Sequence, residues 1–263
     1  MRTAPILLSI ALLASGCRGR REERSSSAPS ASPGPVSAVA KRRPVTTSSS
    51  IALGNLDGDI EQRVGKDDRS PTERLRLTEL LLARAQTLAR VADLERADAL
   101  TARAVAESPA RWPSHFARAL ALAALHRFAE AEERLVTAAK LGAPPERVAS
   151  ARAGVLVARG EYDKAAALER PLGLRDSTAL TTSAVLAART QRPEEAERLF
   201  DLARERYDSV APFPLAWMDF QRATVLEAQG KEDRAREYHS EACEVLPEYA
   251  HAAVHLAATE APA

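Results

Sequence analysis

The stretch from Phe116 to Ala131 reads FARALALAALHRFAEA, and it decides the fold. It holds two runs of helix-forming residues around a short turn, and its apolar positions recur along the chain at about 34 residues, the period of paired-helix solenoids. Alanine at repeated positions lets helix axes approach closely, so the pattern predicts stacked helical hairpins. Three alanine columns share the period and its two irregular steps: Ala85, Ala119, Ala153, Ala184 and Ala223; Ala97, Ala131, Ala165, Ala196 and Ala235; Ala104, Ala138, Ala203 and Ala242.

This pattern resembles the tetratricopeptide repeat (TPR) over residues 74–250. The segments GEYDKA at 160–165 and GKEDRA at 230–235 repeat the turn of the first stretch. The resemblance implies an all-α fold, an α-solenoid of about five TPR-like helical hairpins with terminal capping helices. Glu169 and Pro171 stand where the third hairpin's second helix should continue, so we expect that hairpin to be short or kinked.

Local signals set the limits of the repeat domain, which we place at residues 71–263. Residues 51–70 are predicted to form an N-terminal capping segment, because Leu56, Ile60 and Val64 follow one another at helical spacing. The sequence SPTE at 70–73 is a helix-capping box. Residues 249–258 are predicted to form a closing helix, and residues 207–214, with Pro212 and Pro214, a loop.

Residues 1–16 are predicted to be a signal peptide. After a basic start, the apolar run from Ile6 to Leu13 is far shorter than the about 20 residues that a membrane-spanning helix needs. The run ends in LASGC at 13–17, which resembles the lipobox of bacterial lipoproteins. The resemblance implies lipidation of Cys17. In that family Asp after the Cys signals retention in the inner membrane, and because Arg18 stands there instead, we expect the outer membrane. The alternative is an ordinary signal peptide in which Cys17 is incidental.

Residues 17–50 are predicted to form a disordered, basic tether behind the lipidated Cys17. The segment is rich in Ser and Pro and has almost no large apolar residue, so it cannot offset the entropy of ordering. Its basic clusters at 18–24 and 41–43 either attract anionic lipid headgroups or keep the tether soluble. From Ile51 onward the chain carries 29 basic and 34 acidic residues. That acidic body argues against nucleic-acid binding, which needs an excess of positive charge.

The resemblance also implies that the first helices of the hairpins line a concave face. This face, largely apolar with aromatic anchors, is suited to a peptide or a partner protein. The alternative is that Phe116, Leu120, Trp217 and Phe220 only pack between hairpins. The candidate partner-binding groove consists of Gln86, Arg90, Phe116, Leu120, Val157, Val185, Arg189, Trp217, Phe220 and Glu227.

No residue is predicted to be catalytic, and no metal or cofactor is predicted. The chain has no Gly-x-Ser-x-Gly elbow, no His-Glu-x-x-His motif and no phosphate-binding glycine loop. His251 and His255 lie four residues apart, but two ligands do not make a metal site, and we expect both at the surface. Cys243 loses its only possible disulfide partner once Cys17 is lipidated, so we expect a small buried apolar residue there.

Taken together, these features predict a lipid-anchored protein of the bacterial envelope, in the outer membrane and facing the periplasm. We expect a scaffold or adaptor for another envelope protein or peptide, and not an enzyme. The alternative function is a structural spacer or a self-associating protein without a peptide ligand. The identity of the partner and the oligomeric state stay open.

Overall fold

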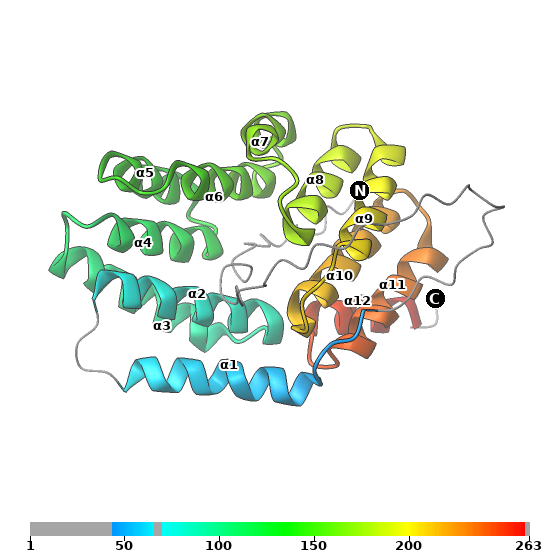
Figure 1. Ribbon diagram of the computed structural model, residues 1–263, viewed down its shortest axis with the longest axis horizontal. Coiled ribbons are helices and arrows are strands. Elements are labelled where there is room, and N and C mark those ends of the chain that lie inside the picture. The colour runs from blue at the N-terminus through cyan, green and yellow to red at the C-terminus, as the bar shows by residue number, and fades with distance from the viewer. Residues whose placement is uncertain (1–43, 66–69, 261–263) are drawn as a thin grey trace, which may run out of the picture.

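The computed structural model describes residues 44–65 and 70–260, and within these residues it contains twelve α-helices, one 3₁₀ helix and no strand. Helix α1 (Ser49–Val64) comes first and α12 (Ala250–Glu260) last. Between them lie five helical hairpins: α2 (Pro71–Leu88) with α3 (Val91–Glu107), α4 (Trp112–Ala124) with α5 (Phe128–Lys140), α6 (Pro145–Ala158) with α7 (Tyr162–Glu169), α8 (Ser177–Arg189) with α9 (Pro193–Glu205), and α10 (Pro212–Ala228) with α11 (Glu232–Val245). The predicted all-α solenoid is confirmed (Figure 1).

The alanine columns lie where neighbouring helices meet. All fourteen alanines of the three columns are buried, and none is more than 5% exposed. Larger side chains at these points would hold the helix axes apart, so the columns fix how closely each hairpin packs. The predicted register is therefore confirmed. In the described residues, none of the helices combines the length and the apolar character needed to cross a bilayer.

Replacing Ala131 by Leu is expected to lower the free energy of unfolding by about 1–3 kcal/mol, because the added atoms have no space between closely packed helices. Ala131 is fully buried, whereas Ala129, two residues earlier on the same helix, is exposed. Urea unfolding of Ala131→Leu, with Ala129→Leu as the matched control, measures this difference. Equal stability of the two variants would contradict the packing role.

Four arginines stand directly before the alanine of a first helix and reach back to an acid on an earlier helix. We call them the bridging arginines: Arg84, Arg118, Arg152 and Arg222. Arg84 Nη1 lies 2.6 Å from Asp57 of α1, and Arg118 Nη1 lies 2.5 Å from Asp98 of α3. Arg152 pairs with Glu132 of α5 at 2.5 Å, and Arg222 pairs with Asp201 and Glu197 of α9 at 2.9 and 2.5 Å. In the fourth hairpin this position is Ser183.

The first bridging arginine is also the most tightly held. Arg84 donates from Nε and Nη2 to the two carboxylate oxygens of Asp93, both at 2.7 Å. The side chains of Arg84 and Asp93 are only 7% and 2% exposed, so neither charge is well hydrated. Such a two-pronged pair fixes the turn between α2 and α3 as well as the contact with α1.

Changing Arg84 to Met is expected to destabilise the fold by about 3–5 kcal/mol, because it leaves the buried Asp93 with only the long ion pair to Arg90, at 3.9 Å. Adding Asp93→Asn to that variant should recover part of the loss, since the uncompensated charge is then gone. The exposed Arg103→Met is the control. Thermal and urea unfolding measure all three, and an Arg84→Met variant as stable as the control would rule out this role.

The third hairpin is short, as predicted. Helix α7 ends at Glu169 and continues as the 3₁₀ helix η1 (Arg170–Leu172), because Pro171 cannot donate a helical hydrogen bond. Glu169 is 8% exposed. Burial raises the pKa of its carboxyl, and a hydrogen bond from Ser150 offsets only part of that effect.

A Glu169→Gln variant should gain stability relative to the natural chain as the pH rises from about 4 to 7. The pKa of Glu169 is raised in the folded protein. At low pH its carboxyl is protonated in both the folded and the unfolded protein, whereas at neutral pH folding must bury or neutralise a charge that glutamine does not carry. Unfolding free energies measured across this range test the prediction. The exposed Glu237→Gln serves as the control, and a pH-independent difference for Glu169→Gln would contradict it.

The loop predicted at residues 207–214 is partly wrong. Helix α9 ends at Glu205, and α10 begins at Pro212, so Pro212 and Pro214 lie in the first turn of a helix. The first backbone N–H groups of a helix have no partner within it, so proline is tolerated there. Elsewhere the capping signals hold: Ser70 accepts a hydrogen bond from the Glu73 amide at the start of α2.

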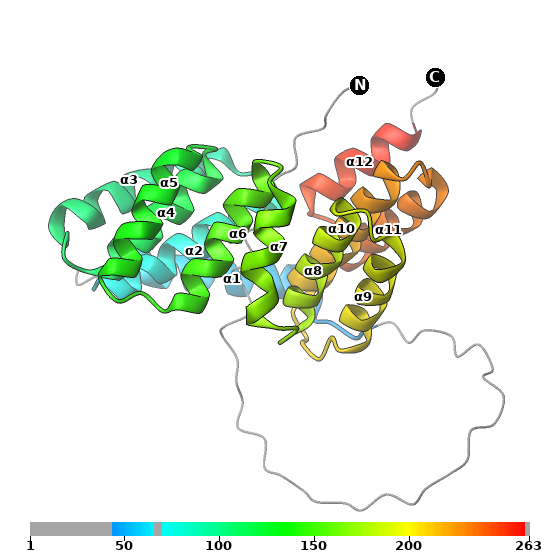
Figure 2. The ribbon, with the colours of Figure 1, turned by 90° about the horizontal axis from the view of Figure 1, so that it is seen from above.

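The two ends of the array meet. Figure 2 shows α1 to α6 grouped on one side and α8 to α12 on the other, with α7 between them. The Thr47 amide donates to the Val210 carbonyl at 2.8 Å, and Ser49 donates to Glu248 at 3.3 Å. Phe213 at the start of α10 packs against the core formed by α1 to α6. The solenoid thus curls until its last hairpin contacts its first.

Candidate partner-binding face

The first helices of the hairpins, α2, α4, α6, α8 and α10, border the centre of the molecule (Figure 1). We call their central side the inner face. Nine of the ten predicted groove residues lie on these five helices, and Arg90 is the residue directly before α3. The structure therefore places the predicted set on the expected helices, but it exposes the members very unequally.

Four of the predicted groove residues belong to the core. Phe116 and Leu120 are each 2% exposed, Phe220 is 5% exposed and Val185 is 9% exposed. Side chains this deeply buried present almost no surface to a partner. Their positions match the packing alternative.

A polar layer covers Phe116. The guanidinium of Arg147, on α6, lies 4.8 Å from the centre of the Phe116 ring and forms an ion pair with Glu79 of α2. Burial raises the pKa of Glu79, and Arg147 and Arg76 offset part of that rise. Since Arg147 connects α6 to α2 across α4, the N-terminal end of the inner face is closed by charged groups.

The closing helix covers Phe220. Rings from α11, α12 and the turn between them surround it, with centroid distances of 5.6 Å to His239, 5.5 Å to Tyr249, 6.0 Å to His251 and 5.4 Å to His255. His251 also donates a hydrogen bond to the Gln86 backbone carbonyl of α2. The two histidines of α12 are therefore half-buried contacts and not the surface residues that we expected.

The open part of the inner face lies in the middle, on α6 and α8. Val157 and Arg189 are partly exposed there, and Val157 packs against the buried cluster that includes Leu186. The Arg189 guanidinium lies 5.9 Å from the ring centre of Tyr162, and among the described residues no acid pairs with it. Of the other predicted residues, Gln86 and Trp217 are partly exposed and Arg90 is exposed.

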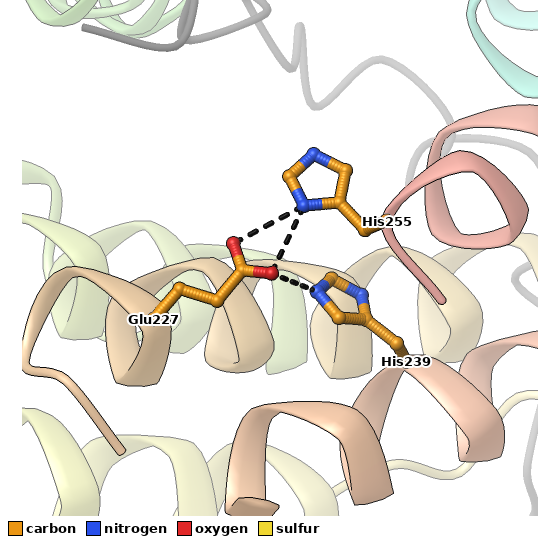
Figure 3. A group of neighbouring side chains, drawn as sticks. All are labelled: Glu227, His239 and His255. Carbon is orange, nitrogen blue, oxygen red and sulfur yellow. Dashed lines mark hydrogen bonds and ion pairs between the residues drawn. The ribbon is translucent and has the colours of Figure 1, made fainter. Parts of the chain in front are cut away.

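Glu227 is shared by two histidines. Its Oε1 lies 2.9 Å from His239 Nε2 and 3.0 Å from His255 Nδ1 (Figure 3). Burial alone would raise the pKa of Glu227, but the hydrogen bonds from the two histidines outweigh burial and lower the pKa to about 2. Glu227 is thus an ionised carboxylate that already has two partners.

Sequence reasoning missed two features of this region. The bridging arginines had a signal, because Arg precedes the column alanine in four of five first helices. The cluster of Glu227, His239 and His255 had none, because its members are 12 and 16 residues apart and come from three helices. Cys243 is a free thiol, half-buried against the core beneath α12, and burial raises its pKa.

One solved structure supports the fold. A crystal structure of a tetratricopeptide repeat protein from Parabacteroides merdae is similar, with a TM-score of 0.55 and 16% identity over 81% of this chain and 79% of that one. YrrB, described as a TPR protein with an unusual peptide-binding site, gives a TM-score of 0.41 and 18% identity over 78% of this chain and 98% of its own. No family model matches the chain, and no curated protein matches it significantly. The chain is an all-α solenoid with the TPR fold.

Proposed function

We propose that this protein is a lipid-anchored envelope scaffold that holds a partner protein or peptide against the middle of its inner face. The fold supports the scaffold part of the proposal, because stacked hairpins build an extended concave surface that suits protein recognition. The anchor and the tether rest on the sequence alone, because Cys17 and most of the tether lie outside the described residues. Placement in the outer membrane, facing the periplasm, follows from the lipobox resemblance.

The observation that carries the proposal is the open stretch on α6 and α8. Val157 and Arg189 remain partly exposed there, while Phe116 and Phe220 at the two ends of the inner face are buried. A guanidinium with no acidic partner among the described residues is suited to a carboxylate or to peptide carbonyls.

A photo-crosslinking amino acid at Val157 tests the proposal in the native envelope. We expect one specific heterologous adduct at this position and none at Ala129, which is exposed on the second helix α5. Arg189→Glu should reduce the adduct at least about tenfold, because it turns an attractive charge into a repulsive one. Phe116→Asp is unsuitable as a test, because Phe116 is in the core and its loss unfolds the hairpin.

The closed form of the array favours a second candidate, a spacer without a ligand. Helix α12 and Arg147 already cover two of the three candidate aromatic residues, Phe220 and Phe116. In that case crosslinking at Val157 yields only self-adducts or none, and Arg189→Glu changes nothing.

A Cys17→Ser variant tests the lipid anchor independently of what the inner face binds. It should move the protein from the membrane fraction to the soluble fraction.

A further inference from the structure

Three side chains from three helices converge at the C-terminal end of the array (Figure 3). Glu227 comes from α10, His239 from α11 and His255 from α12. Their nearest ligand-type atoms, one from each residue, all lie within 4.8 Å of one another. The contacts between Glu227 and the two histidines are closer still, at 2.9 to 3.1 Å.

The chemistry of these donors is specific. Two imidazole nitrogens and one carboxylate form a set that binds zinc and neighbouring divalent transition metals, and three protein ligands leave a fourth position for water. Ligands at about 2.0–2.1 Å from a tetrahedral zinc ion lie about 3.3 Å from each other. The distances from Glu227 to both histidines, 2.9 to 3.1 Å, are already close to that spacing, and all three ligand atoms lie within 4.8 Å of one another. A metal ion therefore requires side-chain movements that set all three distances to this spacing.

The three side chains differ in burial, so one ligand is held rigidly and the other two can be reached by an ion from solvent. His239 is fully buried, so its ring is held in place by its surroundings. The side chains of His255 and Glu227 are 32% and 30% exposed, which leaves a solvent-facing side through which an ion can enter. Phe220 lies against both imidazoles and limits water on the inner side, which strengthens coordination.

One feature opposes binding. Without metal, His239 Nε2 can donate its proton to Glu227, and the opposite nitrogen, Nδ1, is then a buried acceptor without a donor. Coordination through Nε2 moves the proton to Nδ1, which is buried and has no hydrogen-bond partner among the described residues. The free energy of metal binding must exceed the cost of this buried N–H without an acceptor. That requirement favours an ion with high affinity for imidazole, such as zinc, over Mg²⁺ or Ca²⁺.

We propose that Glu227, His239 and His255 form a binding site for one divalent transition-metal ion, with zinc as the best fit. The site joins the last hairpin to the closing helix α12, so the ion acts as a clamp on the C-terminal end of the solenoid. Because this site lies apart from the open stretch on α6 and α8, it is independent of the proposed scaffold function.

The test is a titration of the full chain with Co²⁺ and then Zn²⁺. The protein carries Cys17→Ser and no histidine tag, so that neither competes for metal, and it is first stripped with a chelator. We expect one Co²⁺ per chain, with the strong visible absorption of a four-coordinate site and no thiolate band. Zinc should displace the cobalt at a one-to-one ratio and raise the melting temperature.

Glu227→Gln and His255→Gln each remove one partly exposed ligand. Each should weaken cobalt binding by at least about a hundredfold, which is more than the effect of losing a residue that only hydrogen-bonds to a ligand. His251→Gln is the matched control, because His251 lies one turn away on the same helix and also contacts Phe220. It should leave the affinity unchanged.

Two results would overturn the site. One is an affinity in the natural chain no tighter than in His255→Gln. The other is a loss in His251→Gln equal to that in His255→Gln, which would assign the metal to the histidine pair of α12. Circular dichroism of each variant without metal shows that the fold is intact, so that weak binding cannot be ascribed to unfolding.

Discussion

Close approach of helices at alanine is the constraint on which this structure depends. The column alanines are all buried, and they leave each hairpin no other distance at which to pack on the next. The repeat then propagates by nearest-neighbour contacts, as in any solenoid. The bridging arginines add a directional bond to this packing, because each reaches from a first helix back to an acid on an earlier one.

The curvature that follows from this packing explains the state of the inner face. With five hairpins the array turns far enough for α12 to approach α2, where His251 bonds to the Gln86 carbonyl. Phe116 and Phe220 are covered by the protein's own side chains, Arg147 at one end and the rings of α11 and α12 at the other, and Trp217 alone of the predicted aromatic residues is partly exposed. What remains accessible is a short central stretch and not a long apolar groove.

The sequence is sufficient to predict the hairpins, but not the contact between the two ends of the array. Alanine columns, the capping box at Ser70 and the break at Pro171 are local or periodic signals, and each matches the structure. Burial of Phe220 depends on how α12 folds back, which no local pattern encodes. The same holds for the cluster around Glu227, because its distances are set by the mutual positions of three helices. Pro212 misled the prediction because proline marks a helix start as readily as a loop.

Ser183 has a mechanical consequence. It replaces the bridging arginine at the junction between the third and fourth hairpins, and the helix before this junction, α7, has only eight residues. The two larger buried clusters lie on either side of this junction, one centred on α2 and α4 and the other on α8 to α10, and a smaller cluster with Ala153, Ala165 and Leu186 spans it. The junction between the third and fourth hairpins therefore lacks the ion pair that reinforces the other junctions. On warming, we expect the contacts of Thr47 with Val210 and of Ser49 with Glu248 to break first. The two halves of the solenoid would then pivot about this junction and widen the central part of the inner face while both halves stay folded.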